Sequence, residues 1–125
     1  MPLTVNVKEK IPGVFIVSLA GSLDSNTYTI LDKRLDLILG GSPRIITLDM
    51  EHLDYISSMG VRVVIKAKKS LIKNGGDLIL MNLQPQIQKV FEIINALPSQ
   101  QIFSSIEELD HYLDRMQRKI KEKES

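Results

Sequence analysis

Residues 44–73 have the sequence RIITLDMEHLDYISSMGVRVVIKAKKSLIK, in which a strand pattern gives way to a helix pattern. Residues 44–50 are short, apolar and rich in β-branched side chains, which predicts a buried strand covered on both faces. From residue 61 to residue 73 the apolar side chains recur every three or four positions, which predicts an amphipathic helix. Two adjacent serines, Ser57 and Ser58, therefore lie where a strand ends and a helix begins.

The flanking segments continue this alternation of strands and helices. The predicted strands lie at about residues 3–9, 14–21, 44–50, 77–83 and 100–104, and the predicted helices at about 28–39, 61–73, 85–94 and 106–120. This order predicts an α/β fold: a mixed, mostly parallel sheet of four to five strands, with an N-terminal hairpin and about four helices. Functional loops gather at the carboxyl ends of such strands, where we expect residues 54–60 to lie.

The chain is long enough for one domain, which we expect to span residues 1–125. Ser105 and Glu108 have the spacing of a capping box that opens the last helix, and the polar residues 118–125 are expected to fray. There is no cysteine, which excludes disulfides, and the net charge of +1 argues against a nucleic-acid partner. No signal peptide or membrane-spanning run is visible, so we expect a cytoplasmic protein without membrane insertion.

The sequence offers little for catalysis or metal binding. A serine hydrolase would need a Gly-x-Ser-x-Gly elbow, but the first glycine is missing around Ser57 and Ser58, although His52 lies nearby. The carboxylates Asp24, Asp49 and Asp54 could meet at one end of the sheet and bind a cation, but capping and loop hydrogen bonds explain them better. We therefore predict no catalytic residue, no metal and no cofactor.

The segment ITLDMEHLDYISSMGVRVV carries a resemblance to a known family. Asp49 matches an acidic strand end, Tyr55-Ile56 an apolar pair, and Gly60-Val61 the Gly-Leu step of a motif that opens a helix. Residues 21–24, Gly-Ser-Leu-Asp, match a second motif. Over about residues 3–115, the chain resembles the anti-sigma factor antagonists, which are single STAS-domain proteins of bacteria.

The resemblance implies a phosphorylation site and a mechanism. With Gly60 aligned, the family's phosphorylated serine falls on Ser58, with Ser57 as second choice, and Ser57 replaces the family's aspartate as the helix cap. An anti-sigma factor that is itself a serine kinase would phosphorylate the antagonist and release it, and a PP2C-type phosphatase would reset it. The residues implied in partner binding are Asp24, Ser25, Tyr55, Ser57, Ser58, Met59 and Arg62.

Local physics supports such a switch. A serine in the first turn of a helix is expected to be exposed beside unpaired N–H groups, which tolerate the roughly −1.5 to −2 charge of a phosphate. Arg62, one turn later, either pairs with the phosphate or is a solvated charge. Because Ser57 replaces an aspartate and Arg62 a glycine, an alternative stays open: an unphosphorylated STAS interaction subunit of a signalling assembly or a transporter. The sequence leaves the oligomeric state open.

Overall fold

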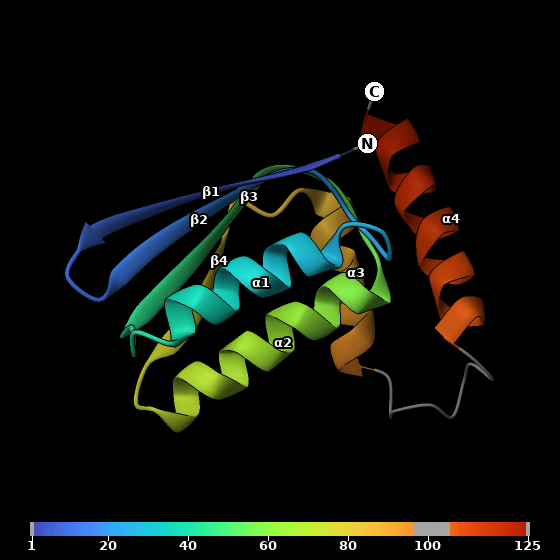
Figure 1. The fold of residues 1–125 in the computed structure, drawn as a ribbon. Helices are drawn as coiled ribbons and strands as arrows, with labels where there is room; N and C mark the ends of the chain where they lie inside the picture. The colour runs from blue at the N-terminus through green and yellow to red at the C-terminus, as the bar shows by residue number, and fades with distance from the viewer. Residues whose placement is uncertain (1, 97–105, 125) are drawn as a thin grey trace.

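The structure is a computed structural model that describes residues 2–96 and 106–124. Within them, four strands and four helices follow one another along the chain (Figure 1). They are β1 (Leu3–Ile11), β2 (Val14–Leu23), α1 (Tyr28–Leu39), β3 (Ile45–Ile56), α2 (Ser58–Lys73), β4 (Asp77–Met81), α3 (Pro85–Ala96) and α4 (Ile106–Glu124).

The strands form one sheet in the order β1-β2-β3-β4. β1 and β2 are antiparallel, whereas β2 pairs with β3, and β3 with β4, in parallel. The predicted α/β fold with an N-terminal hairpin is therefore confirmed. The short strand predicted at residues 100–104 and the capping serine Ser105 lie outside the described residues.

β3 is longer than predicted and is covered more heavily on one face. It continues to Ile56, where it pairs with Leu23 of β2, so residues 51–56 are strand and not loop. Along its first half, Ile46, Leu48 and Met50 are fully buried, whereas the residues between them are half-buried. Figure 1 shows α1 and α2 together on one side of the sheet. The prediction of a strand covered on both faces was therefore wrong.

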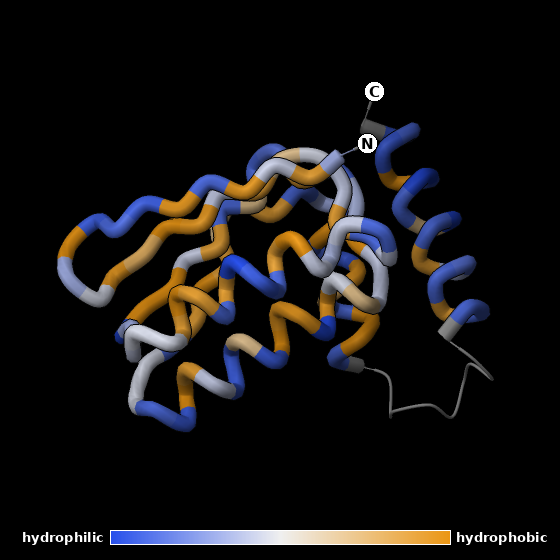
Figure 2. Tube along the Cα trace, viewed as in Figure 1, coloured by the Kyte–Doolittle hydropathy of each residue, from blue (hydrophilic) through white to orange (hydrophobic). Residues whose placement is uncertain are grey.

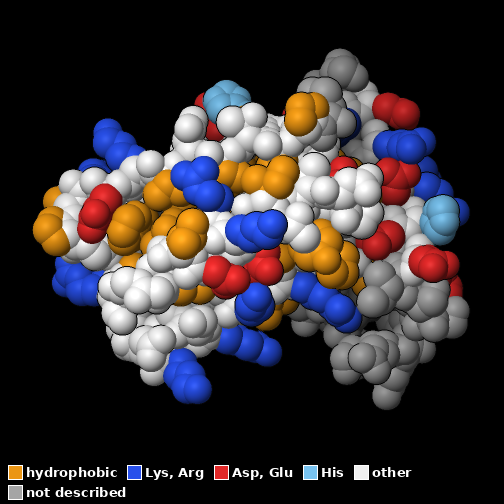
Figure 3. All heavy atoms as spheres, in the orientation of Figure 1, with side chains coloured by type: hydrophobic (Ala, Val, Ile, Leu, Met, Phe, Trp, Pro, Cys, Tyr) orange, Lys and Arg blue, Asp and Glu red, His pale blue; other side chains and the backbone are white. Residues whose placement is uncertain are grey.

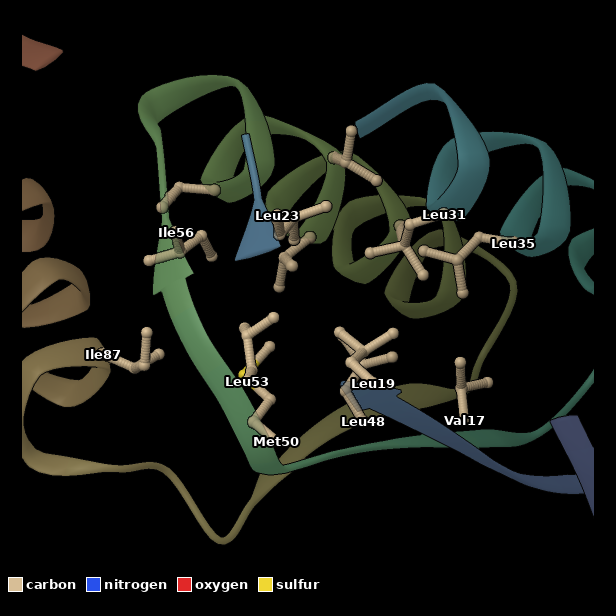
Figure 4. Packing of buried hydrophobic residues seen from close by; sticks show 14 of the residues in the cluster. Val17, Leu19, Leu23, Leu31, Leu35, Leu48, Met50, Leu53, Ile56 and Ile87 are labelled. Atoms are coloured by element: carbon tan, nitrogen blue, oxygen red, sulfur yellow. The ribbon is translucent and has the colours of Figure 1, made fainter. Parts of the chain in front are cut away.

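The core fills the space between the sheet and these two helices. Figure 4 shows Leu19 and Leu48 of the sheet facing Leu31 and Leu35 of α1. All four leucines are at most 2% exposed, and burying each one contributes about 2 kcal/mol relative to leaving it in water. This packing fixes the positions of β2 and β3, and therefore of the loops that leave their carboxyl ends.

The last helix, α4, reaches Glu124, four residues beyond its predicted end. An ion pair between Arg118 and Asp114 (3.1 Å) supports it, and Lys121 and Lys123 in its last turn suit the helix dipole. Fraying of the polar end stays a prediction. In the described part of the chain, no helix is both long enough and apolar enough to cross a membrane.

Candidate functional site

The candidate site lies where β3 ends and α2 begins, and Ser57 forms the junction. Its backbone is extended (φ −96°, ψ 174°), and its Oγ accepts a hydrogen bond from the Gly60 N–H at 3.4 Å. The Ser57 N–H in turn donates to the Leu23 carbonyl at 2.9 Å. Ser57 is therefore the N-cap of α2, as the sequence predicts, and it ties the helix to the end of β2.

Gly60 allows the first turn of α2 to lie directly on the strand ends. A Cβ atom at this position would be 2.7 Å from Leu23 Cγ and 2.9 Å from Ile56 Cγ1, closer than real side chains approach. The backbone of α2 thus packs against both strands with no room for a larger residue. The glycine of the motif is required here by close packing.

Ser58, the first residue of α2, is buried. It is 6% exposed, and its Oγ has no hydrogen-bonding partner among the described residues. Its N–H donates to Asp110 Oδ1 of α4 at 2.9 Å. The expectation of an exposed serine was therefore wrong, because α4 packs over the start of α2 and gives the first-turn N–H a carboxylate partner.

α4 also pairs with the outer edge of β3. Gln117 is 2% exposed, and its side chain makes two hydrogen bonds to Ile56: Nε2 donates to the carbonyl at 2.8 Å and Oε1 accepts from the N–H at 3.1 Å. Lys121 Nζ lies 3.0 Å from Asp54 Oδ1. β4 pairs with β3 only as far as Asp49, so Gln117 takes the place of a neighbouring strand at Ile56.

Two glutamines at the start of α3 complete this edge. Gln84 Nε2 donates to the Glu51 carbonyl at 2.7 Å, and Gln86 Nε2 donates to the Asp54 carbonyl at 3.0 Å. Sequence reasoning missed these glutamines and Gln117. A signal was present for Gln117, which follows Leu113 by four residues on an otherwise apolar stripe and so had to be buried.

Carboxylates surround Tyr55, which lies beside the two serines. Its pKa is raised to about 12, first because burial disfavours the phenolate and then because Asp114, Asp110 and Asp24 are negative, while Arg118 opposes them. Figure 3 shows acidic side chains on the right of the view, over α4, interspersed with lysine and arginine side chains. Two of the three carboxylates that act on Tyr55, Asp110 and Asp114, therefore come from α4.

The remaining predicted residues divide into bonded and exposed ones. Asp24 Oδ1 accepts from the N–H groups of Asn26 (2.9 Å) and Thr27 (3.1 Å), so Asp24 holds the turn before α1. Ser25 and Arg62 are exposed and Met59 is half-buried. Within residues 2–96 and 106–124, Arg62 has no ion pair.

The three carboxylates considered as a cation site are engaged elsewhere. Asp24 bonds its own turn, Asp49 Oδ1 accepts from Asn82 Nδ2 at 3.1 Å, and Asp54 pairs with Lys121. The described residues contain no group of three or more histidines and carboxylates placed to hold a metal ion.

Comparison with known proteins gives consistent matches. The model of the STAS domain matches residues 6–109. The chain is similar to a protein of Bordetella bronchiseptica named "putative anti-sigma factor antagonist BtrV", at 38% identity over 89 residues, which cover 71% of this chain and 77% of that protein. It is also similar to the anti-sigma-B factor antagonist of Listeria monocytogenes, at 25% identity over 93 residues, with coverage of 74% and 82%.

The fold is shared with solved structures. The unphosphorylated form of the anti-sigma factor antagonist SpoIIAA superposes with a TM-score of 0.63 at 24% identity, covering 72% of this chain and 83% of that one. The phosphorylated form of SpoIIAA, from Bacillus, gives the same TM-score at 24% identity, covering 73% and 83%. The shared fold is therefore present in both forms of SpoIIAA.

Proposed function

Because the chain belongs to the STAS domain family, we propose that it is an anti-sigma factor antagonist that acts by partner switching in the bacterial cytoplasm. Unphosphorylated, it binds an anti-sigma factor that is also a serine kinase, and the sigma factor is freed. Phosphorylation of Ser58 then releases the antagonist. The relatives in Bordetella and Listeria, which carry the name of antagonists, support this role and a function in binding rather than catalysis.

The observation that carries the proposal is that the hydroxyl groups of Ser57 and Ser58 make different contacts. Ser57 caps α2, whereas the Ser58 hydroxyl makes no hydrogen bond with any described residue. A buried hydroxyl without a partner costs about 1–3 kcal/mol, so stability gives no reason for a serine at this position. Its place in the first turn of a helix suits a phosphate, because the helix N-terminus favours negative charge.

The proposed reaction is a phosphoryl transfer. The Ser58 oxygen attacks the γ-phosphorus of a nucleoside triphosphate held by the partner kinase, and the bond from that phosphorus to the bridging oxygen breaks. The nucleoside diphosphate leaves, and the hydroxyl proton passes to a base of the kinase. A PP2C-type phosphatase hydrolyses the phosphoserine and restores the hydroxyl.

The partner would bind around the carboxyl ends of β2 and β3. The exposed residues Ser25 and Arg62 and the half-buried Tyr55 and Met59 belong to this end, in the segments that follow β2 or lie on either side of Ser58 in sequence. A dianion introduced into an interface that fits a hydroxyl must be desolvated or meets like charge. A loss of about 3–4 kcal/mol would weaken binding by two to three decades.

The test is to locate the phosphate. Protein isolated from its native cells in the presence of phosphatase inhibitors is expected to carry one phosphate on the peptide that contains Ser58, as measured by intact mass and fragmentation. Ser58→Ala should abolish it, and Ser57→Ala should retain it. Absence of phosphate, or its presence on another residue, would refute the assignment.

One observation favours a second candidate. Since Ser58 is only 6% exposed, the chain could instead be a constitutive interaction subunit of a signalling assembly or a membrane transporter. Size-exclusion chromatography of cell extracts would then show a stable large complex containing protein without phosphate.

A further inference from the structure

The Ser58 hydroxyl cannot receive a phosphate in the conformation described above. The side chain is 6% exposed, and its oxygen is enclosed. Phosphoryl transfer needs this oxygen in line with the γ-phosphate of a nucleotide bound to another protein, and the product is much larger than a hydroxyl. Something must therefore move before the proposed reaction can occur.

α4 provides the cover, through three polar side chains spaced along its length. Asp110 accepts the Ser58 N–H at 2.9 Å, Gln117 makes its two hydrogen bonds to Ile56, and Lys121 pairs with Asp54 at 3.0 Å. Figure 1 shows α4 at the end of the molecule where β3 and α2 meet. The STAS match stops at residue 109, so Gln117 and Lys121 lie beyond it.

α4 is held by few buried side chains for its length of 19 residues. Among its described side chains, only Leu113 and Gln117 are fully buried, whereas α2 buries seven residues. Figure 2 shows α4 as hydrophilic along most of its length, with short hydrophobic steps. A helix with few buried apolar side chains can leave the surface while the rest of the fold stays intact.

We infer that α4 is an autoinhibitory cover for Ser58, which blocks phosphorylation and partner binding while docked and must leave the start of α2 before either occurs. This inference rests on the proposed function for its biological meaning. The cover itself is a property of the molecule that can be measured without any partner.

The charges couple the cover to the phosphate. Asp110 accepts the Ser58 N–H, a donor at the α2 N-terminus that a phosphate on Ser58 could otherwise use, and Asp114, Asp110 and Asp24 act on the neighbouring Tyr55. A phosphate would compete with Asp110 for the Ser58 N–H and repel these carboxylates. Phosphorylation therefore favours the undocked helix, and by reciprocity undocking favours phosphorylation.

A single thiol can report the opening of the cover, because the chain has no cysteine of its own. In Ser58→Cys, we expect iodoacetamide to alkylate the thiol slowly. Adding Gln117→Ala, which removes both hydrogen bonds to Ile56, should accelerate alkylation about tenfold or more. Gln117 is chosen over Asp110, because removing a carboxylate next to the thiol would itself change the thiol pKa and reactivity.

Ala67→Cys is the matched control. Ala67 is on α2, as Ser58 is, and it is 2% exposed and part of the main core. Alkylation of a cysteine at position 67 therefore reports unfolding of the whole domain. With or without Gln117→Ala, position 67 should react far more slowly than position 58, because its alkylation needs global unfolding. The inference is overturned if position 58 reacts as fast as in the urea-unfolded chain, if Gln117→Ala has no effect there, or if positions 58 and 67 react at the same rate. If Gln117→Ala does not fold, Lys121→Ala replaces it, because this substitution removes only an exposed ion pair. Lys121→Ala should give a smaller acceleration of alkylation at position 58. No acceleration would overturn the inference.

Hydrogen exchange tests the coupling to negative charge. Ser58→Asp should accelerate exchange in residues 106–124 relative to Ser58→Ala, leave α1 unchanged, and lose most of its effect when Asp110→Ala is added. Equal exchange in the two variants would refute the coupling. If α4 opens in these assays but the protein from cells carries no phosphate, the proposed function is refuted, whereas the inference that α4 covers Ser58 still stands.

Discussion

The two halves of β3 are held in different ways. Residues 45–49 pair with β2 on one edge and with β4 on the other. Residues 50–56 pair with β2, but on their outer edge side chains of Gln84, Gln86 and Gln117 bond the backbone. Pairing between strands fixes the first half within the core. Pairing by side chains can be exchanged for another partner, and the candidate site lies at this second half.

Deleting the same buried side chain from each region should produce the largest contrast. Leu48 and Leu113 are both 0% exposed, one in the first half of β3 and the other on α4. Leu48→Ala should lower the free energy of unfolding by about 2–5 kcal/mol. Leu113→Ala should lower it less, because the loss cannot exceed the free energy with which α4 docks.

Urea unfolding followed by circular dichroism measures both losses, and hydrogen exchange locates them. In Leu113→Ala, hydrogen exchange should accelerate in residues 106–124. In the core strands and helices, exchange should still require unfolding of the whole domain. Equal losses of stability, with α4 exchanging no faster than the core, would place α4 in the same cooperative unit as the sheet.

Gly60→Ala should break the contact between α2 and the strand ends. The added methyl group would lie 2.7 Å from Leu23 and 2.9 Å from Ile56, and overpacking of this kind costs about 1–3 kcal/mol. Gly40→Ala is the control, because Gly40 has a helical φ of −62° and no neighbour closer than 3.6 Å. Urea unfolding should show a loss only for Gly60→Ala, and similar values for the two variants would argue against the tight packing.

The two serines should respond in opposite directions to the same substitution. Ser57→Ala removes the N-cap and should cost about 1 kcal/mol. Ser58→Ala removes a buried hydroxyl that has no partner among the described residues, so stability should be unchanged or slightly higher. Thermal or urea unfolding of both variants decides the matter. A larger loss for Ser58→Ala would show that its hydroxyl has a structural role.

Titration of Tyr55 should report the docked helix. Its folded-state pKa of about 12 lies above the ordinary value of 10.0, so between these values the folded state keeps a proton that the unfolded state has lost. Stability should therefore fall as the pH rises through this window, and Tyr55→Phe should reduce that fall. In a spectrophotometric titration, Gln117→Ala should move the Tyr55 midpoint down towards 10, since α4 carries Asp110 and Asp114. An unchanged midpoint would mean that α4 stays in place.

The order of strands and helices could be predicted because it depends on local periodicity. The apolar alternation of β1 and the helical stripe of α2 are visible within a few residues. Ser57 was identified as the cap because it takes the place of the family's aspartate, and serine is also a preferred N-cap. The end of β3 was missed, because residues 51–54 are mostly polar and their partners are distant in sequence. Gln84 and Lys121, for example, lie 33 and 67 residues from the groups they bond.

The burial of Ser58 could not be predicted for the same reason. Its cover comes from Asp110, which is 52 residues away and belongs to a helix whose sequence indicates only that it is amphipathic. Periodicity shows which face of such a helix is apolar and does not show which surface it meets. Long-range polar contacts therefore decided the accessibility of the residue that local motifs had identified.

The position of Gln117 and Lys121 has an evolutionary consequence. Both contacts lie in the last turns of the chain described here, far in sequence from the motif they cover and outside the core packing of the sheet. Substitutions there can change how readily Ser58 is uncovered without altering the core that every copy of the domain must keep. Chains with one common fold can in this way acquire different response thresholds by small changes in a terminal helix.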